Sequence, residues 1–159
     1  MQFIFRRSTG PRAPHSFPKS LRRRLSVLRV NERVQRMRTF EGGCHCGRVR
    51  FRVTADLAHI AECNCSICTK KGFLHLIVPP ERFELLRGKD ELTTYEFNTR
   101  TAKHTFCRHC GIQGFYVPRS DPDKFSVNVR CLDDVDLTKI QPDVFDGKHW
   151  EEAIRHYVR

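Results

Sequence analysis

The sequence of 159 residues contains no apolar run of about 18 residues, so a membrane-spanning helix is not expected. A secretory signal is not expected either, because the first residues do not form an apolar stretch followed by a small-residue cleavage site. Residues 1–38 contain no cysteine and a single acidic residue, Glu32. The total length suits one ordinary domain with an extension.

The net charge of +11 is distributed unevenly along the chain. Residues 1–38 carry eleven Arg and Lys against one acid, which gives +10, whereas residues 39–159 are nearly neutral at +1. This difference predicts a basic arm at residues 1–38 and a folded domain at residues 39–159.

Three interpretations of the basic arm remain open. Its Arg-rich, acid-poor composition is typical of a mitochondrial transit peptide. Residues 21–37 could instead form a basic amphipathic helix, with Leu21, Leu25, Leu28 and Val34 on one side. The third interpretation is a disordered tail that contacts phosphate or acidic partners, such as nucleic acid or microtubules.

Short alternating segments after residue 39 predict a mainly β domain. Val49, Phe51 and Val53 alternate with arginines in residues 47–54, as in a half-buried strand. Further strands are expected at residues 58–62, 73–78, 83–86, 93–97, 103–106, 114–117 and 125–129. The one helix expected in the domain is C-terminal, with Asp146 as its N-cap and Trp150, Ala153, Ile154 and Tyr157 as its apolar face.

Seven of the eight cysteines form three tight clusters, at residues 44–46, 63–68 and 107–110. Closely spaced thiolates suit a tetrahedral zinc ion, because one turn of backbone can present several sulfurs at about 2.3 Å from the metal. Cys-x-Cys pairs are poor disulfide partners, since the two Cβ atoms would have to converge to about 3.8 Å. The pattern therefore favours zinc over disulfides and a reducing intracellular compartment, the cytoplasm or the nucleus.

The first and third clusters predict one closed zinc site. Cys107 and Cys110 are followed by Gly111, a spacing typical of a zinc knuckle, and Cys44 and Cys46 supply the second pair of thiolates. A zinc ion with four protein sulfurs has no position left for a substrate, so this site is expected to be structural.

The middle cluster is different, because Cys63, Cys65 and Cys68 can bind one zinc ion and leave its fourth position vacant. A vacant position distinguishes catalytic from structural zinc, and three thiolates favour an ion that holds an incoming thiol as thiolate. The alternative is that the protein closes this site too. The candidate ligands for closure are Cys131, His45, His75, His104 and His109.

The three motifs Gly-Gly-Cys-His-Cys-Gly, Cys-Asn-Cys-Ser-Ile-Cys and Thr-Phe-Cys-Arg-His-Cys-Gly-Ile-Gln, with Leu132-Asp133-Asp134 after them, resemble the glutathione-dependent formaldehyde-activating enzyme family. The resemblance covers about residues 40–150. The phrases Tyr-Glu-Phe-Asn-Thr, His-Thr-Phe-Cys and Phe-Tyr-Val-Pro-Arg-Ser look most like the animal branch that includes centromere protein V.

The resemblance implies a β-tent fold stabilised by two zinc ions. It implies a structural zinc on Cys44, Cys46, Cys107 and Cys110, and a catalytic-type zinc on Cys63, Cys65 and Cys68. The implied reaction adds glutathione to formaldehyde, which is a carbon–sulfur lyase reaction in reverse. This chain has Asn64 where many enzymatic relatives carry another residue, and Cys131 where relatives commonly have a small one.

We therefore expect a zinc-dependent enzyme of the carbon–sulfur lyase type, acting on adducts of glutathione, or another small thiol, with an aldehyde. His75 and His104 are candidates for protonating the alkoxide. The candidates for binding the carboxylates of glutathione are Arg48, Lys70, Lys71 and Arg100. The alternative is a non-catalytic interaction module that binds chromatin or microtubules through the basic arm.

Overall fold

The computed structural model describes residues 37–157. The predictions made for the basic arm, except at its last two residues, lie outside the described residues. Within the described range no helix is long and apolar enough to cross a membrane.

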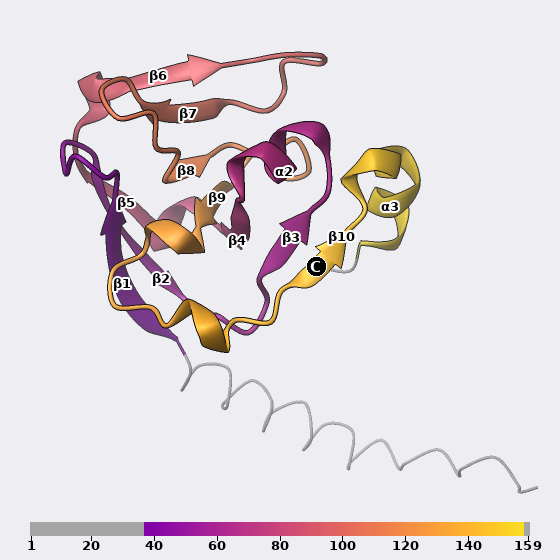
Figure 1. The fold of residues 1–159 in the computed structure, drawn as a ribbon, viewed down its shortest axis with the longest axis horizontal. Coiled ribbons are helices and arrows are strands. Elements are labelled where there is room, and N and C mark those ends of the chain that lie inside the picture. The colour runs from indigo at the N-terminus through magenta and orange to yellow at the C-terminus, as the bar shows by residue number, and fades with distance from the viewer. Residues whose placement is uncertain (1–36, 158–159) are drawn as a thin grey trace, which may run out of the picture. The chain divides into compact units, whose positions relative to one another are not determined.

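Three small sheets make up the domain (Figure 1). The first has the order β1-β2-β5, with strands Arg38–Gly43, Arg50–Ala55 and Phe83–Arg87. The second has the order β10-β3-β4-β9-β8, with strands Asp143–Phe145, Ala61–Cys63, Leu74–Val78, Phe125–Asn128 and Phe115–Tyr116. The third is a hairpin of β6 (Leu92–Tyr95) and β7 (His104–Cys107). The prediction of a mainly β fold with a C-terminal helix is confirmed.

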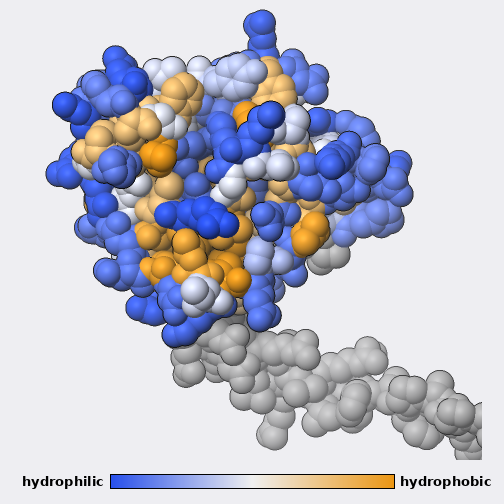
Figure 2. Space-filling view, in the orientation of Figure 1, coloured by the Kyte–Doolittle hydropathy of each residue, from blue (hydrophilic) through white to orange (hydrophobic). Residues whose placement is uncertain are grey.

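The hydrophobic core lies between the first two sheets and follows the predicted alternation. Val49, Phe51 and Val53 are buried, and the arginines between them face outward. The ring of Phe51 is fully buried, with its centroid 5.7 Å from the ring of Phe83 and 5.7 Å from that of Phe115. Figure 2 shows a hydrophilic rim on one face, with hydrophobic residues gathered over the region between β1 and β3.

Strand β4 has its two faces against different surroundings. Leu74, Leu76 and Val78 belong to the core, whereas the alternate residues His75 and Ile77 line a cavity. Strand β8 divides in the same way, with Phe115 in the core and Tyr116 at the cavity. The period-two geometry of strands thus gives the second sheet one face for packing and one for a site.

Each predicted strand overlaps a strand of the structure, and the strand pairs are antiparallel except for one. Strand β10 pairs in parallel with β3, with Phe145 opposite Cys63. A parallel pair needs a long crossover, and the 79 residues between these two strands provide it. Strand β10 has only three residues, in which polar and apolar side chains do not clearly alternate, so the sequence analysis did not predict it.

The helices differ from the prediction at two places. A short helix α2 (Ser66–Lys71) follows Cys65 and ends at Gly72, whose φ of 57° is left-handed, and the sequence analysis did not expect it. At the C-terminus, η5 (Gly147–His149) precedes α3 (Trp150–His156), and the side chain of Asp146 does not cap either. Asp146 stands at the N-cap position of η5, but its carboxylate accepts a hydrogen bond from Asn64 in place of a capping bond, and the N-cap residue of α3 itself is His149.

The remaining turns are short 3-10 helices: η1 (Pro80–Arg82), η2 (Lys89–Glu91), η3 (Val129–Cys131) and η4 (Leu137–Lys139).

Candidate metal centres and active-site cavity

The cysteines of the first and third clusters converge on one point. The Sγ atoms of Cys44, Cys46, Cys107 and Cys110 all lie within 4.8 Å of one another. The Sγ of Cys46 is 3.5 Å from that of Cys44 and 3.7 Å from that of Cys107. Four sulfurs at about 2.3 Å from a tetrahedral zinc ion are separated by about 3.8 Å. The four-cysteine cluster therefore fits a zinc ion.

Two tight turns produce this geometry. The Cys44 N–H donates to the carbonyl of Val49 at 3.0 Å, and the Val49 N–H donates to the Sγ of Cys44 at 3.3 Å. In the second turn, the Gly111 N–H donates to the carbonyl of Cys107 at 2.8 Å, with φ of Gly111 at 73°. Cys107 is fully buried, so the cluster fixes the end of β7 to the end of β1.

The Sγ atoms of Cys63, Cys65 and Cys68 also lie within 4.8 Å of one another. Among residues 37–157, no fourth cysteine, histidine or carboxylate ligand atom comes within that distance of all three. The three thiols share their protons unequally. Hydrogen bonds from Cys63 and Cys68 lower the pKa of Cys65 to about 2, and hydrogen bonds with Cys63 and Cys65 raise the pKa of Cys68. The pKa of Cys63 is raised as well, chiefly by its hydrogen bond with Cys65, so without a cation only Cys65 is favoured as a thiolate. A bound zinc ion would allow all three thiols to ionise, because the sulfur ligands of a metal are deprotonated.

The segment that follows β10 closes over the three-cysteine cluster. The side-chain amide of Asn64 donates to Asp146 Oδ1 at 2.9 Å and accepts from the Lys148 N–H at 3.0 Å. Gly147, between these two partners, is so close to the cluster that a Cβ there would lie 2.3 Å from the Sγ of Cys63. Asn64 thus joins the cysteine loop to the C-terminal segment.

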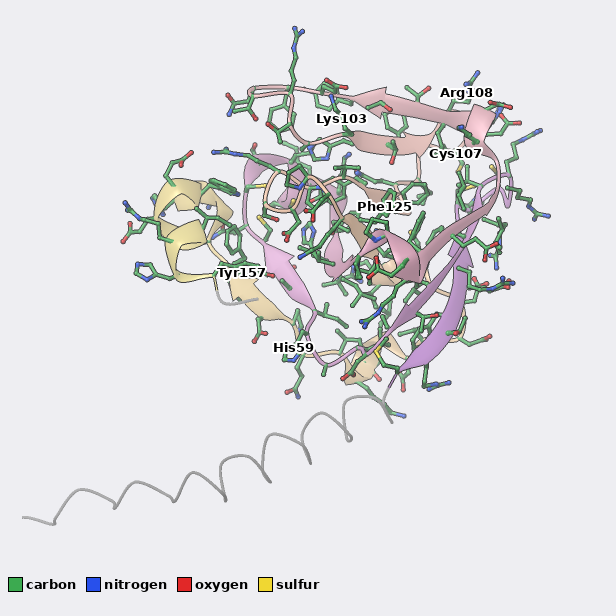
Figure 3. The ribbon with its side chains drawn as sticks, turned by 180° about the vertical axis from the view of Figure 1, so that it is seen from behind. His59, Lys103, Cys107, Arg108, Phe125 and Tyr157 are labelled. Carbon is green, nitrogen blue, oxygen red and sulfur yellow. The ribbon has the colours of Figure 1, made fainter. Side chains whose placement is uncertain are left out.

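The three-cysteine cluster opens into a cavity of about 280 Å³, which we call the active-site cavity. Its other walls are largely apolar and come from α3, from β4 and from the β6–β7 hairpin, and include Ile77, Phe97, Phe145, Trp150, Ile154 and Tyr157. None of the four cysteines of the other cluster lines it. In Figure 3, Tyr157 of the cavity wall and Cys107 of the four-cysteine cluster lie on opposite sides of the domain.

Two buried histidines, His75 and His104, border the active-site cavity. The sequence analysis named both as candidate proton donors and zinc ligands. The Nδ1 of His75 is 3.1 Å from the Oγ of Ser126 and 3.4 Å from the hydroxyl of Tyr116, while its Nε2 has no hydrogen-bond partner within residues 37–157. His104 stacks on Tyr116 with a centroid distance of 4.8 Å. Burial lowers the pKa of both histidines to about 4, so both are neutral at pH 7.

The other two candidate histidines lie elsewhere. The Nε2 of His109 contacts the carboxylate of Glu91 at 2.5 Å on the exposed surface. His45, between two cysteines of the four-cysteine cluster, is exposed. Neither lines the active-site cavity.

The basic residues expected to meet glutathione do not line this cavity. Arg48, Lys70, Lys71 and Arg100 are all absent from its walls, and the basic residue that borders it is Arg119. The guanidinium of Arg119 lies 3.6 Å from the ring centroid of Trp150 and forms an ion pair with Glu151. The sequence gave no sign of this residue, because its position depends on how the loop after β8 meets α3.

Cys131 does not join the three-cysteine cluster. Its Sγ lies 3.7 Å from the carbonyl oxygen of Gln113 and it lines a different cavity. Burial raises the pKa of its thiol to about 11, so Cys131 is a neutral thiol.

The fold and the two cysteine clusters define a small β protein with thiols arranged to hold metal ions. The family model of the glutathione-dependent formaldehyde-activating enzyme matches residues 39–152, and the chain belongs to this family. This confirms the resemblance read from the cysteine motifs, at the level of the family as a whole. The chain is also similar to a crystal structure of a Rhodobacter sphaeroides protein, a target of the Northeast Structural Genomics project. The identity is 37% and the TM-score 0.61, over 65% of this chain and 97% of that one.

Proposed function

We propose that residues 39–159 form a zinc-dependent enzyme of the carbon–sulfur lyase type, with the basic arm as a separate extension. Its substrates would be glutathione, or another small thiol, and formaldehyde or another small aldehyde. The observation that carries this proposal is that all three cysteines of the three-cysteine cluster line the largely apolar active-site cavity, whereas no cysteine of the four-cysteine cluster lines it. Family membership supports the choice of thiol and aldehyde.

The two clusters would have separate roles. Cys44, Cys46, Cys107 and Cys110 would hold a structural zinc ion, because their four sulfurs complete a tetrahedron. Cys63, Cys65 and Cys68 would hold a catalytic-type zinc ion, which when bound supplies a position that keeps an incoming thiol ionised. Cys131 lies at another cavity, and this supports a site with three protein sulfurs.

The reaction moves one proton and forms one bond. The sulfur of the substrate thiol bonds to the carbonyl carbon, the π electrons of the carbonyl move to oxygen, and that oxygen takes up the proton lost by the thiol. His75 and His104 are our candidates for carrying this proton, since both border the cavity and both are neutral imidazoles that can accept at one nitrogen and donate from the other.

The remaining cavity residues would bind and orient the thiol. The apolar walls limit the water around the sulfur, and a carboxylate of the substrate would replace the exposed Glu151 as the ion-pair partner of Arg119. Trp150 and Glu151 hold that guanidinium at the rim. We propose Arg119 in place of the four basic residues named from the sequence.

Exchange NMR on formaldehyde and glutathione with the zinc-loaded full chain tests the proposal. We expect faster interconversion of free and adduct signals than without protein, and loss of that acceleration in Cys65→Ala. Cys131→Ala is the matched control and should keep the activity. An exchange rate that is the same for the wild type and Cys65→Ala would contradict the proposal.

A further inference from the structure

A second cavity, of about 540 Å³, lies beside the end of α2. The segment 111–113 after the four-cysteine cluster, the end of α2 and the 3-10 helix η3 contribute to its walls. No residue lines both cavities. The reaction proposed above makes no use of this second cavity.

Gln113 is the buried polar residue of the second cavity, and it is 6% exposed. Its Oε1 accepts a hydrogen bond from the ammonium of Lys71, which fixes the amide with its Nε2 directed to the other side. That Nε2 is buried and has no acceptor among the described residues. Leaving a buried amide donor unpaired costs about 1–3 kcal/mol, so a small movement of the side chain that brings Nε2 to an acceptor oxygen of a ligand in the cavity would be favourable.

Two cationic residues at the second cavity, Lys71 and Arg130, have no acidic partner among residues 37–157. Lys71 donates to Gln113, a neutral residue, and Arg130 donates through its Nε to the carbonyl of Gly72 at 2.8 Å. The terminal nitrogens of Arg130 make no hydrogen bond to the described part of the chain. Hydrogen bonds also link the walls, since Asn128 Nδ2 donates to the carbonyl of Gln113 at 3.3 Å and Asn128 Oδ1 accepts from the Arg130 N–H at 3.2 Å.

The third cation of this cavity is already neutralised. Arg50 forms an ion pair with Asp133, and a second carboxylate, Glu41, lies 3.6 Å from its guanidinium. The cavity therefore combines two available positive charges, one buried amide donor and a single carboxylate that is occupied by Arg50. This combination suits a group with several acceptor oxygens and a negative charge.

We propose that the second cavity is a binding site for a small oxyanion, a carboxylate or a phosphate group, held by Lys71, Arg130 and Gln113. The amide of Gln113 supplies a neutral donor, and the two cations supply charge. The site is independent of the carbon–sulfur chemistry, and its occupancy can be measured without any assay of activity.

An NMR titration tests this proposal with the zinc-loaded, ¹⁵N-labelled full chain. Sodium phosphate is added at constant ionic strength, with sodium chloride as the reference and sodium acetate as a second arm, while the side-chain amide of Gln113 is followed. We expect a saturable shift with a dissociation constant on the order of 1 mM. Comparing phosphate with acetate then distinguishes a phosphate site from a carboxylate site.

Adjacent lysines supply the matched control. Lys71→Met and Arg130→Met should each weaken binding by about tenfold, the usual loss for one charge-assisted hydrogen bond. Lys70→Met changes the same charge on the same helix but does not line the cavity, so it should bind as the wild type does.

Three results would overturn the proposal. One is a shift that grows in proportion to salt without saturating, and another is equal binding by Lys71→Met and the wild type. The third is no phosphate or acetate binding by the wild type together with loss of zinc in Lys71→Met, which would mean that these cations only balance the nearby thiolates.

Discussion

Gly147 is the residue whose lack of a side chain is most directly required by the three-cysteine cluster. A Cβ at this position would lie 2.3 Å from the Sγ of Cys63 and 2.9 Å from the Cβ of Cys65, closer than atoms can approach. The hydrogen bonds of Asn64 to both neighbours of Gly147 hold the backbone in this position. No spacing in the sequence links Gly147 to cysteines more than eighty residues earlier.

We predict that Gly147→Ala displaces the cysteine loop and removes the second metal ion while the first remains. Zinc content measured on the purified protein should fall from about two to about one ion per chain. Val144→Ala, on the exposed face of β10, is the control and should keep both ions. Two retained ions in Gly147→Ala would show that the loop tolerates the added methyl group.

His75 gives the stability of the protein a defined pH dependence. Burial lowers its pKa from 6.5 to about 4, so the unfolded state binds the proton more tightly than the folded state. The stabilisation is complete above pH 6.5 and is lost as the pH falls from 6.5 to about 4, by up to about 3 kcal/mol.

We predict that His75→Gln, which cannot be protonated, shows a shallower loss of the free energy of unfolding over this pH range. Urea denaturation of the wild type and the variant at matched zinc occupancy measures the difference between them. Because both proteins have the same cysteines, acid release of zinc contributes equally to both. Parallel pH profiles would mean that His75 is solvated in the folded state.

At the scale of elements, the C-terminal helix α3 forms one wall of the active-site cavity. Trp150, Ile154 and Tyr157 line it, and Trp150 is the single tryptophan of the chain. The apolar spacing that predicted this helix is correct, and these residues face a site as well as the sheet. Tyr157 packs edge-on against Phe145 of β10, with ring centroids 5.3 Å apart.

We predict that glutathione binding changes the fluorescence of Trp150 in a saturable manner. The ring borders the cavity and the guanidinium of Arg119, so a thiol entering there alters its surroundings. Cys65→Ser should abolish the response, and Glu152→Ala, an exposed change on the same helix, should keep it. A glutathione response that persists in Cys65→Ser would place binding away from the cysteine cluster.

Most strands were predictable because their alternation is a local property, although β1 was not among the predicted strands. In residues 47–54 every second side chain is apolar, and those side chains are the buried ones. The elements that close the site carried no such signal. Helix α2 is only six residues long, and β10 has three residues that find their partner far away in the sequence.

The sequence predicted which cysteines come together in each of the two clusters. Thiol spacing of two or three residues is imposed by the metal, so it remains visible in the sequence. The remaining parts of the site depend on tertiary packing. Arg119 and Gly147 reach it from loops, and Asp146, expected as a helix cap, instead binds Asn64.

At the scale of the whole molecule, the four-cysteine cluster connects segments sixty-one residues apart, as measured from Cys46 to Cys107. We predict that Cys107→Ser lowers the free energy of unfolding by several kcal/mol, since it removes one of the four thiols that would hold the structural zinc ion. Cys131→Ser should lower it by about 1 kcal/mol or less. Denaturation with and without a zinc chelator measures both effects, and equal losses in the two variants would contradict a structural role for the cluster.

The central claim is that one zinc ion has four protein sulfurs and the other has three. Zinc-edge X-ray absorption of the full chain, together with zinc stoichiometry, tests it most directly. We predict two ions per chain, an average sulfur coordination between three and four, and the same average in Cys131→Ala. An average of four sulfurs that falls in Cys131→Ala would show that the second site is closed, and would contradict the proposed enzyme.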